Sequence, residues 1–375
     1  MASDKPAEVG KEQWEFSRRR FLKFAGGAAV AGSAYSGLAG LLGAEGANAA
    51  RLARENSDTA FFASHPKYKF VMVNHVTTNP FFTATIYGIQ DACSITGCAY
   101  QWTGSTSSLV SQMVSAFNSA IAAKASGIGC CLIDNTAFNA PVNNALSAGI
   151  PVIAYNADVA AGVPNNRMSY VGQNNLTAGA AVAAQILKTG LVKKGDLVAG
   201  IIATPGTGNI QPRIDGAKPV LVKAGMDFVE VGTSATTGSP EYNKIAAWYA
   251  GHKNCKFMFG VDSGDSDAIA QFIQTNNLKG KMGGSGWDVG TPVVQGVQAG
   301  NLSFTIDQQA YLQGFDTIMQ LFLFQVSGGL MKPTNTDTGL GIVVQSTVQP
   351  YLAKNRFEGT ASKQQTLKPP ASIPH

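Results

Sequence analysis

The sequence predicts an α/β protein with two doubly wound lobes, each built around a parallel sheet. From residue 67 onwards, short apolar runs of strand length alternate with longer segments whose apolar residues recur at helical spacing. This alternation is typical of parallel sheets that carry helices on both faces. It continues through a second half, and 375 residues with 45% hydrophobic and 14% charged side chains can form two cores.

The first half contains five predicted strands and three predicted helices. Pro80 favours a helix start soon after the first apolar run. A stripe of apolar residues from Leu109 to Ile121 indicates the second helix, and Gly149 ends the third. In chain order, the elements are strand 70–74, helix 81–96, strand 99–103, helix 109–126, strand 130–134, helix 140–148, and strands 151–156 and 168–172.

The second half repeats the pattern with six helices and five strands. Each predicted strand again follows a helical segment, as a parallel sheet requires. In chain order, the elements are helix 175–187, strand 197–203, helix 213–224, strand 227–232, helix 242–249, strand 255–261, helix 266–275, strand 283–287, helix 292–299, strand 302–307 and helix 311–326.

We predict that the two halves form lobes around a cleft, because several strands connect them rather than one linker. The N-terminal lobe is predicted to comprise 67–173 and 309–336, and the C-terminal lobe 174–308 and 337–350. Residues 351–375 are polar and contain three prolines, so we predict a tail that either wraps the surface or is loose.

Residues 1–49 have the features of an export signal. The heptapeptide SRRRFLK at 17–23 matches the twin-arginine consensus at every position, and a weakly apolar stretch with six glycines follows it at 24–43. The small residues Ala-Asn-Ala at 47–49 predict cleavage near Ala49. We therefore predict export by the twin-arginine machinery to the periplasm. The alternative is an uncleaved N-terminal anchor.

Charge and cysteine content exclude other classes of protein. The formal net charge is +5, but no cluster of Lys and Arg rises above an ordinary solvated surface, so nucleic-acid binding is not expected. No histidine lies at ligand spacing from any of the five cysteines, and we predict no metal site. Cys130 and Cys131 are predicted to be buried strand residues. The sequence does not decide whether Cys93 and Cys98 form a local disulfide, which an oxidising compartment would allow.

Polar and aromatic residues follow successive predicted strands. The loops after parallel strands meet at one edge of the sheet, where open α/β proteins bind small ligands. Carboxylates, amides and a guanidinium can hydrogen-bond to neutral hydroxyl groups, and aromatic rings can stack on sugar faces. The residues at these strand ends are Asn79, Phe81, Phe82, Asp134, Asn135, Asn156, Asp158, Gln211, Arg213, Asp262, Trp287, Asp288 and Gln308. We therefore predict a site for a sugar or related polyol.

Each of these residues also has a structural interpretation. Phe81 and Phe82 can be core residues of an amphipathic helix, and Asp262 and Asp288 precede predicted helices and can be caps. The two aspartates can also be imagined as the carboxylate pair of a glycosidase. However, no motif of a serine hydrolase, a nucleotide-binding loop or a zinc protease is present, and the four histidines are scattered. We therefore expect neither catalysis nor a cofactor.

From about Lys67 to Val348 the chain resembles the periplasmic binding proteins of type I, in particular the ribose-binding kind. The stretches that carry the resemblance are TNPFF at 78–82, GIPVIAYN at 149–156, RIDG at 213–216, GWD at 286–288 and TIDQ at 305–308. The resemblance implies two lobes joined by a three-strand hinge, which we expect near 172–174, 308–309 and 334–338.

The resemblance also implies which residues contact a sugar. By position in the matching stretches, these are Asn79, Phe81, Phe82, Asn156, Asp262, Asp288 and Gln308. Ala157 and Gln211 stand where the family usually has arginines, and Asp262 where it usually has asparagine. Arg213 is a candidate substitute for one missing arginine. These departures leave the ligand open among sugars, deoxysugars, polyols and furanosyl signalling compounds.

The resemblance and the leader together predict the periplasmic solute-binding component of an ABC importer. We expect a monomer that captures its sugar or polyol between the lobes, closes at the hinge and delivers the ligand to a permease in the inner membrane. A ligand-binding sensor for chemotaxis or signalling is the alternative, followed by an exported sugar-active enzyme. The leader stands where a DNA-binding helix pair would be, which excludes a transcriptional regulator.

Overall fold

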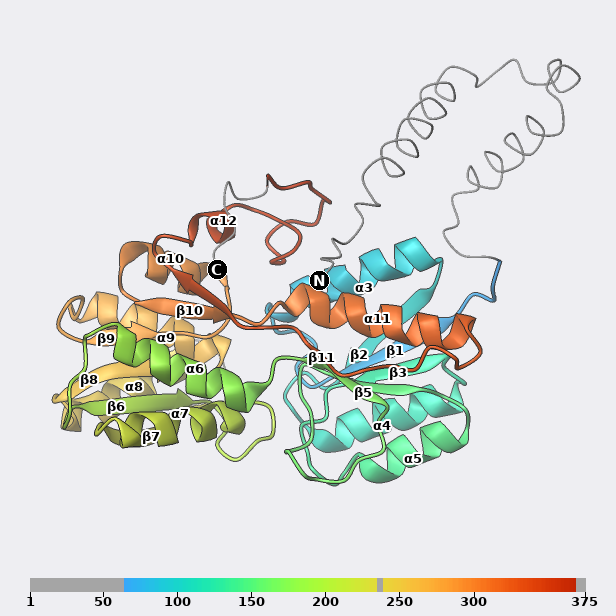
Figure 1. Cartoon of the computed structure of the whole chain (residues 1–375), viewed down its shortest axis with the longest axis horizontal. Coiled ribbons are helices and arrows are strands. Elements are labelled where there is room, and N and C mark those ends of the chain that lie inside the picture. The colour runs from blue at the N-terminus through green and yellow to red at the C-terminus, as the bar shows by residue number, and fades with distance from the viewer. Residues whose placement is uncertain (1–63, 235–238, 369–375) are drawn as a thin grey trace, which may run out of the picture. The chain divides into compact units, whose positions relative to one another are not determined.

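A computed structural model describes residues 64–234 and 239–368. This part of the chain forms two six-stranded sheets, each flanked by helices (Figure 1). The predicted export signal, residues 1–49, lies outside the described residues. Among the helices of the described part, none is both long and apolar enough to cross a membrane.

The first lobe is a parallel sheet in the order β11-β5-β4-β3-β1-β2. Its strands are β1 (Lys69–Asn74), β2 (Ala99–Gly104), β3 (Gly127–Cys130), β4 (Val152–Tyr155), β5 (Ser169–Gly172) and β11 (Thr336–Asp337). Its helices are α3 (Phe82–Thr96), α4 (Val110–Ala122), α5 (Asn139–Ser147) and α11 (Ala310–Val326). Helices α3 and α11 lie on one face of the sheet, and α4 and α5 on the other (Figure 1).

The second lobe has the strand order β12-β10-β9-β8-β6-β7. Its strands are β6 (Leu197–Ile202), β7 (Asp227–Gly232), β8 (Cys255–Gly260), β9 (Gly283–Ser285), β10 (Phe304–Asp307) and β12 (Gly341–Val344). Its helices are α6 (Asn175–Lys188), α7 (Gln211–Lys223), α8 (Ser239–Gly251), α9 (Ser263–Thr275), α10 (Thr291–Ala299) and α12 (Gln349–Leu352).

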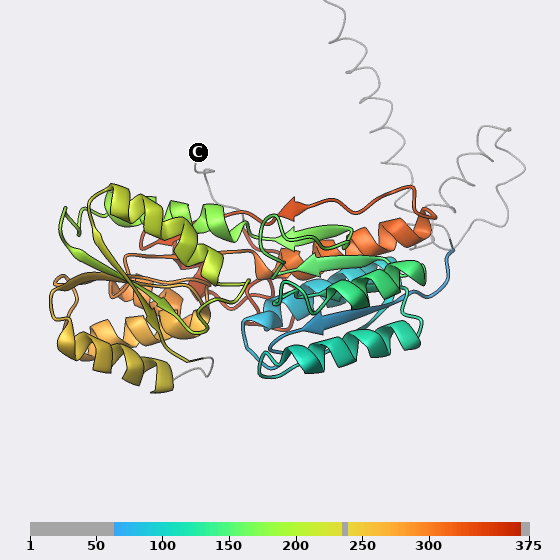
Figure 2. The ribbon, with the colours of Figure 1, turned by 90° about the horizontal axis from the view of Figure 1, so that it is seen from below.

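Both faces of the second sheet are covered, as a buried parallel sheet requires. Val198 and Ile202 of β6 belong to one hydrophobic cluster with residues of α6 and α7. Ala199 and Ile201, which alternate with them along β6, belong to another cluster with residues of α8, α9 and α10. Figure 2 shows these two groups of helices on opposite sides of the sheet.

The predicted fold class is confirmed, although β12 and the position of β3 differ from the prediction. The chain passes between the sheets after β5, β10 and β11. Strand β12 runs antiparallel to β10, because it enters the edge of the second sheet directly from the first lobe. The predicted strand 130–134 lies earlier, since Gly127 to Cys130 pair with β1, and 131–133 stay buried beyond the end of the sheet. Strand β11 lies within the hinge segment expected at 334–338, whereas β12 was not predicted. The exact lobe boundaries stay a prediction.

Helices α3 and α11 approach each other closely through two glycines. A Cβ added at Gly88 would lie 2.1 Å from the carbonyl oxygen of Tyr311, and one at Gly314 would lie 2.2 Å from a carbonyl oxygen of α3. Gly179 and Gly216 make the equivalent close contacts between α6 and α7. Each lobe therefore depends on backbone-to-backbone packing that a larger residue cannot reproduce.

We expect Gly88→Ala to destabilise the protein by about 1–3 kcal/mol, because the added methyl group forces α3 and α11 apart. Alanine is otherwise the better helix former, so the sign of the change separates packing from propensity. Gly251→Ala in α8 is the matched control, since its Cβ would meet no atom within 4 Å. Urea unfolding of both variants measures the difference, and equal stabilities would contradict the packing argument.

The structure also tests the predictions for the cysteines and for the tail. Cys93 and Cys98 are free thiols, and burial raises the pKa of Cys93 to about 12. Cys130 and Cys131 are fully buried, as predicted, but Cys131 lies just beyond the end of β3 and is not a strand residue. The described part of the predicted tail, residues 351–368, contains buried side chains and packs against the lobes.

Candidate functional site

A cavity of about 690 Å³ lies between the two lobes. The start of α3 forms one wall, the loops after β8, β9 and β10 form another, and the segment after β12 forms a third. Its polar and aromatic lining residues include Asn79, Phe81, Ser263, Asp267, Asp288, Asp307, Gln308, Tyr351, Lys354, Glu358 and Thr360. This volume suits a small ligand. A second hollow, of about 880 Å³ between β2 and α4, has a neutral lining and none of the predicted site residues.

The first wall presents one of the two predicted phenylalanines. Phe81 lines the cavity, whereas Phe82 is 2% exposed and packs against His75 and Trp102 with ring centroids 5.4 and 5.9 Å away. The two phenylalanine rings meet edge to face at 4.8 Å. Asn79 also lines the cavity, and its side-chain oxygen accepts a hydrogen bond from the Phe81 N–H at 2.9 Å. Phe82 therefore supports the wall from the core and Phe81 forms its surface.

The opposite wall contains a hydrogen-bonded pair, Asp288 and Gln308. The Gln308 side-chain amide donates to Asp288 Oδ1 at 2.6 Å, and the two residues are 3% and 6% exposed, respectively. Asp288 has a left-handed backbone, with φ of 71°, which its N–H stabilises by donating to the Ile306 carbonyl at 2.7 Å. Burial raises the pKa of Asp288 to about 6, although nearby Arg213 and the Gln308 bond lower it. Both side chains line the cavity.

Arg213 lies directly behind this pair. Its guanidinium donates to Gln308 Oε1 at 3.3 Å, to the Val261 carbonyl at 2.6 Å and to Asn175 Oδ1 at 2.9 Å. It also lies 4.4 Å from the ring centroid of Trp287, which is fully buried. Neither Arg213 nor Trp287 is part of the cavity lining. Arg213 therefore orients Gln308 and provides a positive charge near Asp288.

Asn156 is connected to the same pair through a residue that sequence reasoning missed. Its side-chain amide donates to Gln313 Oε1 at 3.0 Å, and Gln313 in turn donates to Gln308 Oε1 at 3.1 Å. Gln313 is fully buried on the inner face of helix α11, beside the buried apolar residues Ala310, Ile318 and Leu321 of the same helix. A glutamine in the middle of an apolar helical stripe is the signal that could have identified it.

The three connections between the lobes are themselves hydrogen-bonded to one another. Gln173, after β5, donates to the Gly339 carbonyl at 2.9 Å and accepts from the Trp287 indole at 3.1 Å. Thr338, before β12, donates to the Gln308 carbonyl at 2.8 Å. Gln173 follows a strand, so its position after β5 could have identified it in the same way as the other residues at strand ends. The network links the cavity wall to the segments that join the lobes.

Gln211 does not belong to the cavity. Its side-chain oxygen accepts from the Gly206 N–H at 2.7 Å, and its amide donates to Asp215 at 3.1 Å and Glu230 at 3.0 Å. Both carboxylates are exposed. The step of two residues from Gln211 to Arg213 turns through about 200° around a helix, so that only one of the two can point inwards.

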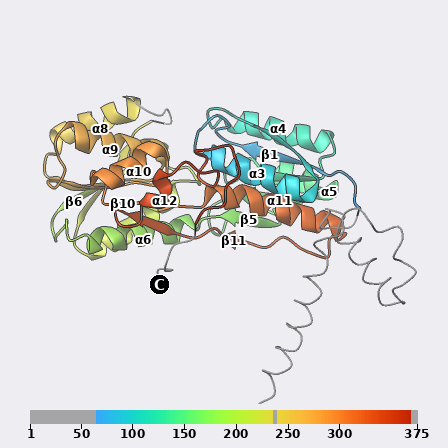
Figure 3. The same ribbon diagram turned by 90° about the horizontal axis from the view of Figure 1, so that it is seen from above.

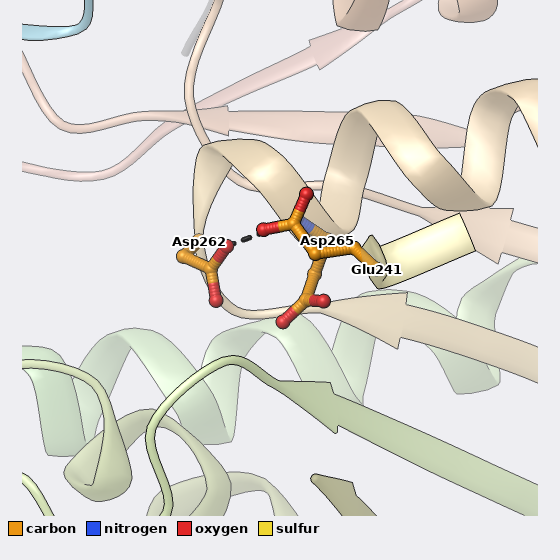
Figure 4. Close-up of side chains that lie close together, drawn as sticks. All are labelled: Glu241, Asp262 and Asp265. Atoms are coloured by element: carbon orange, nitrogen blue, oxygen red, sulfur yellow. Dashed lines mark hydrogen bonds between the residues drawn. The ribbon is translucent and has the colours of Figure 1, made fainter. Parts of the chain in front are cut away.

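Asp262 also lies outside the cavity lining and caps α9. Its side chain accepts from the N–H groups of Asp265 at 3.0 Å and Ala203 at 3.2 Å. With Glu241 and Asp265 it forms a group whose carboxylate oxygens lie within 4.8 Å of one another (Figure 4). Burial and the Asp262 carboxylate raise the pKa of Asp265 well above its ordinary value. Within residues 64–234 and 239–368, this is the group spaced closely enough to share a cation.

Two further cavity residues were not predicted. Asp267, in the first turns of α9, lines the cavity, and burial raises its pKa to about 7 with help from Asp288. Asp307, the last residue of β10, lines the cavity and accepts from the Tyr351 hydroxyl at 3.2 Å. Burial raises its pKa as well. Both stand within a few residues of predicted positions, so a wider window at each strand end would have included them.

Comparisons with known proteins give one matching family model, one relative of high identity and several similar structures. Residues 70–325 match the family model described as a periplasmic binding protein domain. The xylose/arabinose-binding protein XylF of Sulfolobus acidocaldarius is 40% identical over 310 residues, which cover 80% of this chain and 76% of the relative.

Solved structures show the same fold. A solute-binding protein of an ABC transporter from Burkholderia graminis, in complex with D-arabinose, superposes with a TM-score of 0.70 at 25% identity and covers 76% of this chain and 98% of its own. A carbohydrate transporter from Acidothermus cellulolyticus, in complex with myo-inositol, has a TM-score of 0.70 at 20% identity and covers 79% and 100%.

Proposed function

The chain belongs to the family of periplasmic binding proteins, and we propose that it captures a sugar or related polyol in the cavity between its lobes and delivers it to the permease of an ABC importer. The family consists of solute-binding proteins, so we propose binding without catalysis. The 40% identity to a xylose/arabinose-binding protein makes these pentoses the first ligands to test.

One arrangement carries the proposal: Phe81 from the first lobe and the Asp288–Gln308 pair from the second lobe line the same cavity. An aromatic face packs against the C–H surface of a sugar ring, while a carboxylate and an amide bind its hydroxyl groups. A ligand that contacts both walls at once joins the lobes. Asn79 adds a second amide on the aromatic side.

The segments that connect the lobes provide a mechanism by which a bound ligand favours closure. A ligand that touches both lobes favours the closed arrangement only by its extra contacts in that state. Gln308 lines the cavity and also accepts, through its backbone, from Thr338 in another connection. Contact of a ligand with Gln308 is therefore transmitted directly to two of the three connecting segments, which we propose to act as the hinge.

The charge of the cavity narrows the class of ligand. Asp267, Asp288, Asp307 and Glu358 line it, with Lys354 as the basic residue of the lining. An anionic sugar would meet this acidic lining, in which Asp288 is ionised above about pH 6, in a poorly solvated space, which is unfavourable. We therefore propose a neutral aldose or polyol and not a uronic acid or a sugar phosphate.

The predicted leader supports an extracytoplasmic role, which the family also implies. We propose export by the twin-arginine machinery, cleavage near Ala49, and action in the periplasm as a monomer. Peptide mass spectrometry of the exported protein tests the cleavage, since a mature N-terminus at Ala50 is expected.

Titration of the mature protein by calorimetry tests the ligand class. We expect binding of xylose or arabinose and none of glucuronate or xylose 5-phosphate. The proposal predicts saturable heats with one site per chain. Failure to bind any neutral sugar or polyol in a broad panel would reject the proposed function.

Phe81→Leu should weaken binding of that ligand by roughly tenfold, because leucine keeps the bulk of the wall but not its flat face. Phe228→Leu is the matched control, since this half-buried phenylalanine lies on β7 and is not part of the cavity lining. Equal affinities of the two variants would remove Phe81 from the site.

A further inference from the structure

The third wall of the cavity comes from the segment that follows β12. It is formed by the segment 353–364, here named the C-terminal strap, together with Tyr351 and Leu352 of α12. Helix α12 packs against α10 of the second lobe, and the strap then runs to α3 of the first lobe (Figure 3). The strap lies outside residues 70–325, which match the family model. It is therefore a fourth connection between the lobes.

A buried ion pair anchors the strap on the first lobe. The Arg356 guanidinium donates to both carboxylate oxygens of Asp91, at 2.8 and 2.9 Å, and the two residues are 7% and 8% exposed. The same guanidinium lies 4.2 Å from the ring centroid of Tyr87. Gln364 donates to Asp91 at 3.0 Å. A bidentate, stacked and desolvated arginine is a specific docking contact, unlike a surface ion pair.

The strap has a fixed internal shape. Asn355 Oδ1 accepts from the Glu358 N–H at 2.8 Å, and the Thr360 hydroxyl accepts from the Asn355 N–H at 2.8 Å. Gly359 has φ of 74°, and a Cβ there would lie 2.8 Å from the backbone nitrogen of Ala84. The strap thus rests directly on the first turn of α3, the turn that follows Phe81.

This shape places Glu358 on the cavity wall. Burial raises the pKa of Glu358 to about 8, and the nearby carboxylate of Asp307 adds to the effect. A carboxyl group that keeps its proton at neutral pH can both donate to and accept from a hydroxyl group. The side chain therefore has the chemistry of a sugar-binding group in a cavity that already contains Asp288 and Gln308.

We propose that the C-terminal strap is part of the ligand site, with Glu358 as a hydrogen-bonding contact to the bound sugar or polyol. The proposal rests on the proposed function and extends it. The ligand then contacts three pieces of chain: the start of α3, the Asp288–Gln308 pair and the strap. Docking of the strap through Arg356 and binding of the ligand stabilise each other.

Calorimetry of the full-length mature protein with the sugar that the wild type binds tests this. Glu358→Ala should weaken binding roughly tenfold, as expected for one lost hydrogen bond, and Arg356→Ala should do the same through release of the strap. Lys368→Ala, at an exposed position beyond the strap, is the control and should bind like the wild type. Wild-type affinity in Glu358→Ala would overturn the strap proposal and leave the proposed function standing. A wild type that binds no sugar or polyol would overturn both.

A second measurement does not depend on how the variants fold. Hydrogen–deuterium exchange of the wild-type protein should slow at the hydrogen-bonded amides of 358–361 when the sugar is added, because the ligand holds the strap in place. The exchange of 197–202 in β6 is the internal reference. Slowing at β6 alone, or no ligand-dependent change in the strap, would contradict the proposal.

Discussion

Asp288→Asn is expected to weaken ligand binding by roughly a hundredfold and, at the same time, to make the ligand-free protein more stable above pH 6. Binding falls because asparagine cannot offer a charged acceptor to the hydroxyl groups of the ligand. Asparagine still accepts from Gln308, so the local geometry at 2.6 Å is retained. The two effects have opposite signs, which distinguishes loss of a ligand contact from damage to the fold.

The gain in stability follows from the pKa of Asp288. Burial raises this pKa from 3.8 to about 6, so the folded state holds the proton more tightly than the unfolded state. The associated stability is fully present below pH 3.8 and is lost as the pH rises through about 6. A pKa change of this size corresponds to at most about 3 kcal/mol. Asparagine carries no such penalty, so its advantage should be absent at pH 4 and present at pH 8.

Urea unfolding at pH 4 and pH 8 measures this difference, and calorimetry measures the affinity. Asp227→Asn, at an exposed position of β7, is the matched control and should change neither quantity. A variant that loses stability at pH 8 would mean that the Asp288 carboxylate is favourable in the fold. Wild-type affinity would exclude it from the ligand site.

The expectation that site residues follow the ends of strands identified the correct edge of the sheets but not the direction of each side chain. It selected Phe81 and Phe82 together, although neighbouring helical residues point about 100° apart, and only Phe81 lines the cavity. Gln211 was selected for the same reason and points to Asp215 and Glu230. Sequence position gives the end of a strand, whereas side-chain direction depends on the helix phase that tertiary packing sets.

The C-terminal strap was beyond the reach of sequence reasoning. Its polar composition predicted a tail that either wraps the surface or is loose, and local propensity does not decide between these. What orders it is Arg356 meeting Asp91, a residue 265 positions earlier in the chain. A contact of this kind is invisible to periodicity. The alternation of strands and helices, by contrast, is local information, and it predicted the two lobes.

Arg213→Met is expected to lower the free energy of unfolding by about 3 kcal/mol at pH 8, because several buried polar groups lose their donor at once. Arg213 is 4% exposed, and its guanidinium donates to Gln308, Asn175 and the Val261 carbonyl. Methionine keeps the unbranched apolar stem of the side chain but cannot donate a hydrogen bond. Affinity for the ligand should fall as well, since Gln308 loses the bond that orients it.

The pH dependence of this loss identifies its electrostatic part. Arg213 lowers the pKa of Asp288, so its removal raises that pKa further and makes the ionised carboxylate more costly to bury. The destabilisation should therefore be larger at pH 8 than at pH 4, where Asp288 is protonated in both proteins. Lys223→Met, exposed on the same helix, should be within about 0.5 kcal/mol of the wild type at both pH values.

In the double variant Arg213→Met with Asp288→Asn, the extra loss of stability at pH 8 should disappear, whereas the part due to the missing hydrogen bonds should remain. If the loss were the same at both pH values, Arg213 would act through its hydrogen bonds alone, and its charge would have no part in keeping Asp288 ionised for the ligand.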